Sequence, residues 1–203
     1  CVEVHATINS CMDFNTVSQF EQRLAEWWGA PHAVAVDCCT HAVELCLRHT
    51  DAISATCPQH TYISIPFTFD KLGIQWSFRD YHWEDYYSIT DQITDSAVYW
   101  QPGGYLGGLQ CLSFQFKKPL NLGRGGAILC DDIRDYYALK AMSYDGRLGP
   151  EPWAEQSIKT IGYHYYMTPE TAQCGIDKLP DSVATKQWSW RDYPDLTKMP
   201  VFG

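Results

Sequence analysis

The sequence predicts an α/β fold whose mainly parallel sheet is covered by helices on both faces. The first observation is order: short apolar runs typical of buried strands alternate with longer segments of helical periodicity, which favours parallel strands joined by helices. The second is size, because 203 residues, of which 45% are hydrophobic, are enough for one sizeable core. We therefore expect a single domain over residues 1–203, with ligands at the carboxyl ends of its strands.

The first predicted elements are a helix, a strand and a second helix. Apolar residues over 17–28 fall near one helical face, and Gly29 follows as a stop signal. Residues 33–36 form a continuous apolar run, which indicates a short buried strand. The second helix begins at Thr40, after a tight turn.

The middle of the chain continues this alternation. Residues 56–58 indicate the end of a strand, and residues 62–72 have the pattern of a helix. Apolar and polar residues alternate over 74–78, as in a strand. A further strand lies within residues 93–99 and ends near Asp95.

The C-terminal half adds two strands and two helices. The apolar runs at 109–116 and 127–130 predict the strands, and the periodic segments at 131–143 and 168–179 predict the helices. From residue 180 onward the chain is rich in Trp, Pro and Asp. We expect this tail to be extended and to pack on the surface or on a partner chain.

Charge and composition exclude several classes of function. The formal net charge of −9 argues against nucleic acid and anionic membranes as main partners, although a local site can still hold a phosphate. No apolar run reaches the length of a transmembrane span, and no signal peptide is evident. The nine cysteines form no Cys-x-x-Cys pair and the seven histidines lack metal-binding spacing, so we expect no metal, free thiols and a cytoplasmic location.

The most informative stretch is residues 113–126, in which a serine, two lysines and a glycine cluster lie between two predicted strands. Burial can lower the pKa of a lysine next to a buried strand, and its neutral amine can then condense with a carbonyl. Ser113 could hold a phosphate oxygen, and the glycines let the backbone turn beside a ligand. The residues alone are equally compatible with two surface lysines, Lys117 and Lys118, beside a glycine hairpin.

This stretch resembles the active-site loop of the DegT/DnrJ/StrS family of sugar aminotransferases, which use pyridoxal phosphate (PLP). That family has Ser-Phe, a lysine five residues after the serine, and then Gly-Glu-Gly-Gly. Counting five from Ser113 gives Lys118, so the resemblance implies that Lys118 forms the aldimine with PLP and is catalytic. Arg124 stands in place of the family's glutamate, and Gln115 in place of a frequent histidine.

A second match lies between the first predicted strand and the second helix. From the residues alone, the start of this helix is either a phosphate cradle or a simple Thr N-cap. Residues 33–45 resemble the family's Val-Ala-Val-Ser-Ser-Gly-Thr-Ala-Ala-Leu. Thr40 matches, whereas Cys39 replaces the glycine and His41 an alanine. The resemblance therefore implies that Cys39, Thr40 and His41 bind the cofactor.

Three further positions follow in the family's order. Tyr62 matches the aromatic that stacks on the pyridine ring, although a core tyrosine is the alternative. Asp95 matches the aspartate that pairs with the pyridine nitrogen, although a turn aspartate is the alternative, and Val98 replaces a glutamine. His164 takes the place of an asparagine that reaches the phosphate in the partner subunit.

The resemblance covers about residues 20–179 and implies a reduced fold type I large domain that lacks the C-terminal small domain. It also implies a homodimer with the site between subunits. The large aromatic residues of the tail fit an interface, so the dimer interface is one expected place for residues 180–203. Because the connection before Asp95 is short, we predict that one central strand is missing. The Asp95 strand should then adjoin the strand that ends near Pro58, with no antiparallel insertion of residues 86–89.

The resulting functional prediction is a PLP-dependent aminotransferase. It would move an amino group, by resemblance from glutamate, to a keto sugar that is nucleotide-linked. One alternative is a PLP-dependent sugar dehydratase, although relatives of that kind replace the lysine with histidine. The other is a non-catalytic relic that binds PLP.

Overall fold

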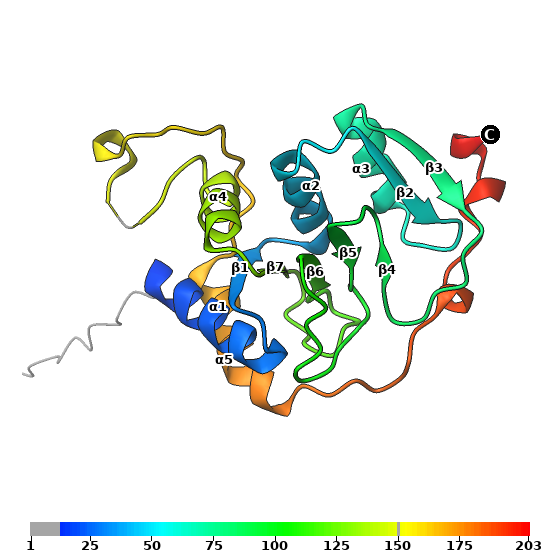
Figure 1. Ribbon diagram of the computed structural model, residues 1–203. Coiled ribbons are helices and arrows are strands. Elements are labelled where there is room, and N and C mark those ends of the chain that lie inside the picture. The colour runs from blue at the N-terminus through cyan, green and yellow to red at the C-terminus, as the bar shows by residue number, and fades with distance from the viewer. Residues whose placement is uncertain (1–12, 150) are drawn as a thin grey trace, which may run out of the picture.

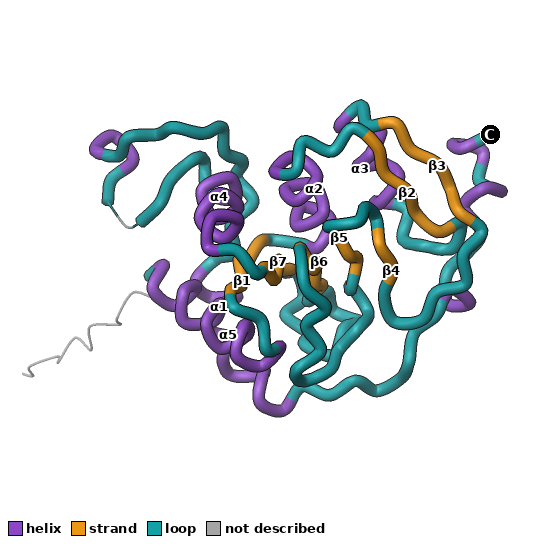
Figure 2. The backbone as a smooth tube through the Cα atoms, viewed as in Figure 1, coloured by secondary structure: helices purple, strands orange, loops and turns teal. Residues whose placement is uncertain are grey.

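The computed structural model describes residues 13–149 and 151–203, and its centre is a five-stranded sheet (Figure 1). The strand order is β1 (His32–Val36), β7 (Gly126–Cys130), β6 (Leu109–Ser113), β5 (Ile93–Asp95) and β4 (Tyr87–Ser88). A two-stranded sheet, β2 (Ser54–Pro58) and β3 (Gln75–Arg79), lies beside it (Figure 2). The predicted α/β class is confirmed.

The prediction of a mainly parallel sheet is wrong, because the larger sheet is mixed. Strand β7 runs antiparallel to both of its neighbours, β1 and β6, and β4 runs antiparallel to β5. Only β5–β6 and β2–β3 are parallel pairs in the described residues. The reason is local, since the connection from Ser113 to Gly126 contains no helix and returns the chain as a hairpin.

The prediction about the missing strand is also wrong. Tyr87 and Ser88 of β4 pair antiparallel with Asp95 and Thr94, which is the insertion that we did not expect. On its other side, the backbone N–H of Thr56 donates to the carbonyl of Ile89 at 3.1 Å, so β4 lies between β5 and β2. Tyr87 and Ile89 are both buried, and their burial favours this place in the sheet.

Among the residues described, five α-helices cover both faces of the sheet, as predicted. They are α1 (Phe14–Trp28), α2 (Cys39–His49), α3 (Ser64–Leu72), α4 (Ile133–Ser143) and α5 (Pro169–Lys178). α1 and α5 pack on one face through a cluster that includes Phe20, while α2, α3 and α4 contribute to the cluster on the other face (Figure 1). α1 ends where Gly29 adopts φ 71°, a left-handed conformation that glycine accepts at no steric cost. Within the described residues, none of the helices has the length and apolarity needed to cross a bilayer.

The C-terminal tail folds back over the body of the same chain (Figure 1). After α5 it forms four 3₁₀ turns, η2 (Leu179–Asp181), η3 (Trp190–Asp192), η4 (Leu196–Lys198) and η5 (Pro200–Phe202). Backbone N–H groups link it to two loops, with Trp190 donating to the Trp83 carbonyl at 3.1 Å and Leu196 to the Gln59 carbonyl at 2.9 Å. Leu196 is only 1% exposed, so the tail is anchored by an apolar side chain as well as by hydrogen bonds.

Candidate active site

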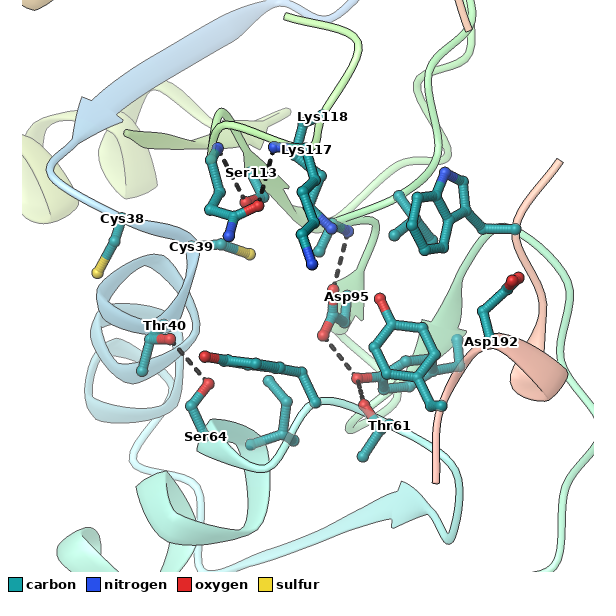
Figure 3. A pocket seen from close by; sticks show the side chains of 18 of the residues that line it. Cys38, Cys39, Thr40, Thr61, Ser64, Asp95, Ser113, Lys117, Lys118 and Asp192 are labelled. Carbon is teal, nitrogen blue, oxygen red and sulfur yellow. Dashed lines mark hydrogen bonds between the residues drawn. The ribbon is translucent and has the colours of Figure 1, made fainter. Parts of the chain in front are cut away.

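A cavity of about 430 Å³ lies where the carboxyl ends of β5 and β6 meet the start of α2 (Figure 3). This is the position that the sequence predicts for a ligand. Six of the eight predicted site residues line it: Cys39, Thr40, Tyr62, Asp95, Ser113 and Lys118. They come from four separate parts of the chain, which only the fold brings together.

Lys118 lies in the loop after β6 and is partly buried, whereas its neighbour Lys117 is exposed. Burial lowers the pKa of Lys118, and the nearby Cys39 and Asp95 oppose this shift. Its Nζ lies 5.5 Å from the centre of the Trp188 ring. A lowered pKa increases the fraction of neutral amine, which is the form that attacks a carbonyl.

Asp95 ends β5 and is only 5% exposed. Its Oδ2 accepts a hydrogen bond from the Tyr87 hydroxyl at 2.6 Å, and its Oδ1 accepts one from the Ala97 N–H at 2.9 Å (Figure 3). Burial raises the pKa of Asp95, while these two hydrogen bonds and the charge of Lys118 oppose the rise. A buried carboxylate of this kind is suited to a cationic partner in the cavity.

The other end of the cavity carries hydroxyls and the start of a helix. The side chains of Thr40 and Ser64 share a hydrogen bond of 2.8 Å, and Ser113 ends β6 nearby (Figure 3). The first N–H groups of α2 lack helical partners, which makes this end attractive for an anion. A Cβ on Gly126 would lie 2.5 Å from the carbonyl carbon of Cys38, so glycine lets β7 approach this turn closely.

Two predicted residues do not line the cavity. His41 stacks on Tyr165 with ring centroids 3.6 Å apart, and its Nδ1 lies 2.6 Å from Oδ1 of Asp37. Although burial opposes it, the hydrogen bond to Asp37 and the neighbouring Cys38 raise the pKa of His41 to about 9. His164 is exposed and its Nδ1 lies 2.9 Å from Oδ2 of Asp145, so its role toward a partner subunit stays a prediction.

The turn before α2 also gathers three potential metal ligands. The side-chain ligand atoms of Asp37, Cys38 and His41 lie within 4.8 Å of one another. The carboxylate of Asp37, however, is already bonded to His41 and, at 2.7 Å, to Nη2 of Arg124. We assign no metal to this cluster, because a metal ion would have to displace both partners and the proton of His41.

Sequence reasoning missed several residues of the cavity. Tyr87 and Thr61 reach it from β4 and from the loop after β2, and the sequence assigned a role to neither. The tail contributes Trp188, Asp192 and Tyr193 to the lining, and Asp192 lies on the side of the cavity away from Thr40 (Figure 3). The richness of the tail in aromatic residues was the one available signal, and it does not indicate which surface the tail covers.

A lysine and an aspartate that face one cavity, with hydroxyls and a helix N-terminus at its other end, are typical of PLP-dependent transferases of fold type I. The sequence matches the family model described as the DegT/DnrJ/EryC1/StrS aminotransferase family over residues 2–96 and 96–193. The chain therefore belongs to that family. Comparison with curated protein sequences found no match.

Solved structures with the same fold agree with this assignment. 3-Amino-5-hydroxybenzoic acid (AHBA) synthase is 20% identical with a TM-score of 0.67, over 83% of this chain and 56% of that one. Spr1654 from Streptococcus pneumoniae, in its PLP-form, is 18% identical with a TM-score of 0.68, over 82% and 59%. DesI, in the presence of its TDP-sugar product, is 20% identical with a TM-score of 0.64, over 82% and 53%. This chain thus spans little more than half the length of these proteins, and the likeness establishes the fold.

The side chains of the cavity fit PLP, the cofactor of this family. Lys118 suits the aldehyde, and the buried Asp95 suits the ring nitrogen. Thr40, Ser113 and the start of α2 suit the phosphate. Tyr62 is 62% exposed and lines the cavity, so it leaves an open face on which a flat ring can stack.

Proposed function

We propose that this protein is a PLP-dependent aminotransferase in which Lys118 and Asp95 are the catalytic residues. The single observation that carries the proposal is their convergence: Asp95 ends β5, Lys118 follows the parallel neighbour β6, and both line one cavity with Thr40 and Ser113. The packing of a core requires neither a partly buried lysine nor a buried aspartate, since both charges cost free energy on burial. Membership of the aminotransferase family supports the same reaction type.

In this proposal each side chain has a separate task. PLP, when bound, supplies an aldehyde and an electron-withdrawing ring. The Nζ of Lys118 would hold the aldehyde, and the same amine would serve as the general base and acid that moves a proton between substrate and cofactor carbons. The carboxylate of Asp95 keeps a proton on the ring nitrogen, while Thr40, Ser113 and the start of α2 anchor the phosphate. The lowered pKa of Lys118 makes its amine available as a base nearer neutral pH than that of an exposed lysine.

The proposed substrates are an amino donor, glutamate, and a nucleotide-linked keto sugar as the acceptor. Support for the sugar comes from the fold, because DesI shares it and was solved with its TDP-sugar product. We further propose a homodimer in the cytoplasm, with the site between subunits and His164 directed at the phosphate held by the partner. The PLP-binding domain would then span the whole chain, 1–203.

The test is spectroscopic. The purified protein is mixed with PLP, and a new absorbance band is expected that disappears when glutamate is added. Lys118→Ala should abolish the band. Lys117→Ala is the matched control because it removes the same side chain from the next, exposed position. A band that persists in Lys118→Ala would contradict the proposal.

The same experiment separates the alternatives. A relic without turnover would form the Lys118-dependent band but would not lose it to glutamate. A dehydratase would convert a keto sugar without incorporating nitrogen, which product analysis with labelled glutamate would detect. Lys118 itself disfavours the dehydratase, because relatives with that activity are expected to carry histidine there.

A further inference from the structure

The inserted strand β4 brings a tyrosine into direct contact with the catalytic aspartate. Tyr87 and Asp95 are register partners across β4 and β5, so their side chains emerge on the same face of the sheet. Tyr87 is 4% exposed, and its hydroxyl donates to Oδ2 of Asp95 at 2.6 Å. This contact exists only because β4 occupies the place between β5 and β2.

A third residue, Thr61, extends the hydrogen bond between Tyr87 and Asp95 into a chain, and the carboxylate of Asp95, which only accepts, sets the direction of that chain. The hydroxyl of Thr61, which is 2% exposed, lies 2.5 Å from the hydroxyl of Tyr87 (Figure 3). A tyrosine has one hydroxyl proton, and here it points to Asp95, so Thr61 must donate to Tyr87. The Ala97 N–H donates to the other carboxylate oxygen. Both carboxylate oxygens of Asp95 therefore face donors, an arrangement that favours the ionised form.

The other groups around Asp95 offer little further support for its charge. The titratable groups that face it are Cys39 from α2, Cys57 from β2, Cys111 from β6, Lys118 and Tyr193. Burial raises the pKa of Cys39, Cys57 and Tyr193, and the hydrogen bond to Cys46 together with burial raises the pKa of Cys111, so these groups stay neutral. Burial, Asp95 itself and its hydrogen bond likewise keep the pKa of Tyr87 well above its usual value, so Tyr87 remains a donor. Lys118 is the cation of this group, and the proposed function uses its amine at the cofactor aldehyde.

We propose that Tyr87 is a positioning residue whose hydroxyl, oriented by Thr61, holds Asp95 ionised and aimed at the ring nitrogen of the cofactor. This inference rests on the proposed function for the binding of PLP. It deepens that function, because it assigns a task to the strand that distinguishes this sheet from the predicted one. Tyr87 acts through Asp95, so its effect must depend on the ring nitrogen.

That dependence provides the test. The affinities for PLP and for its 1-deaza analogue, in which C–H replaces the ring nitrogen, are measured by equilibrium dialysis at neutral pH. Tyr87→Phe keeps the buried ring and should weaken PLP binding roughly tenfold, as the loss of a hydrogen bond to a charged group predicts. Binding of the deaza analogue should change less than about twofold, since that ligand offers Asp95 no nitrogen to hold. Asp95→Asn is the reference and should show the same selective loss.

Two further variants and the pH dependence complete the experiment. Tyr99→Phe makes the same chemical change at a hydroxyl bonded to Gln101, outside the cavity, and should bind both ligands as the parent protein does. Thr61→Val should give a smaller loss of the same selective kind. In Tyr87→Phe, the pH at which the preference for PLP over the deaza analogue develops should move upward, because the pKa of Asp95 loses its strongest lowering contact.

The outcomes are distinct. Equal losses for both ligands would mean that Tyr87 is only structural, and no loss for either would remove its role. In both cases the proposed function would stand, because the parent protein would still bind PLP. If the parent protein bound neither ligand, both the proposed function and the role of Tyr87 would be overturned.

Discussion

The two sides of the cavity are built in different ways. The inner wall, defined here as Asp95, Ser113 and Lys118, comes from two neighbouring strands and the loop that follows one of them. The outer wall, defined as Trp188, Asp192 and Tyr193, comes from the C-terminal tail. The first is specified by short motifs, and the second by contacts between distant segments.

The outer wall depends on aromatic packing and on backbone hydrogen bonds. The ring of Tyr193 lies 5.5 Å from that of Trp83, and its carbonyl lies 2.9 Å from Nδ1 of His60. Two lysines lie near the Trp188 ring, with Lys186 Nζ at 3.8 Å and Lys118 Nζ at 5.5 Å from its centre. We propose a division of tasks in which the inner wall performs the chemistry and the outer wall retains the substrate.

The largest effect should come from the inner wall. Asp95→Asn removes the buried negative charge and should lower kcat by roughly 10²–10³-fold, as for other losses of a preorganised electrostatic contact. Steady-state kinetics with glutamate as donor would measure it. Urea unfolding provides the control, since the free energy of unfolding should change far less than the activation free energy that the fall in kcat represents. A kcat of the Asp95→Asn variant equal to that of the parent protein would contradict the assignment of the chemistry to the inner wall.

The anchor of the outer wall should matter mainly for stability. Leu196→Ala truncates a side chain that is 1% exposed and should lower the free energy of unfolding by about 2–4 kcal/mol. Denaturant titration would measure it. The matched control is Val201→Ala, because Val201 lies in the same tail and is 61% exposed. If both variants were equally stable, the tail would not be docked as described.

The outer wall itself should affect substrate binding. Trp188→Ala should raise KM about tenfold and leave kcat within a few-fold, because the wall contributes binding that does not change during the reaction. The expected split is the reverse of that for Asp95→Asn. A fall in kcat at unchanged KM would mean that Trp188 takes part in the chemistry assigned to the inner wall, and it would contradict the proposed difference between the two walls.

The smallest effect concerns His41, which lies in the first turn of α2 and does not line the cavity. Its pKa is raised from 6.5 to about 9, so its interaction with Asp37 is fully present below about pH 6.5 and is lost as the pH rises toward 9. The free energy of unfolding should therefore fall across this window. His41→Gln should reduce the fall, and urea titrations at the two ends of the window would show it. An identical pH dependence in the variant would mean that His41 does not titrate as described.

Much of the fold was predictable because short stretches of sequence specify its helices and strands. The helices and the strands other than β4 follow from periodicity and end signals, and each lies close to its expected place. The direction of β7 and the insertion of β4 were not predictable in this way. Both depend on which strands find partners, and a two-residue strand such as Tyr87–Ser88 has no periodicity of its own.

The candidate site likewise has features that local sequence predicted and features that depend on contacts between distant segments. The resemblance, through the spacing between Ser113 and Lys118, predicts that Lys118 is the reactive lysine, and the exposure of Lys117 agrees with that prediction. The same reasoning failed to foresee that His41 turns toward Tyr165 and Asp37, away from the cavity. A motif specifies where a side chain stands along the chain, whereas its direction depends on the neighbours with which it can pair.

The sequence by itself determined the chemical groups of this protein and their order along the chain. Local sequence signals also specify the strand and the turn in which Ser113 and Lys118 stand. The tertiary structure alone decided which groups share a cavity. It placed Tyr87 and Thr61 behind Asp95 and brought Trp188 to face Lys118. The physical reason is that burial and cross-strand pairing are settled by contacts between distant segments, and these contacts exist only once the whole chain has folded.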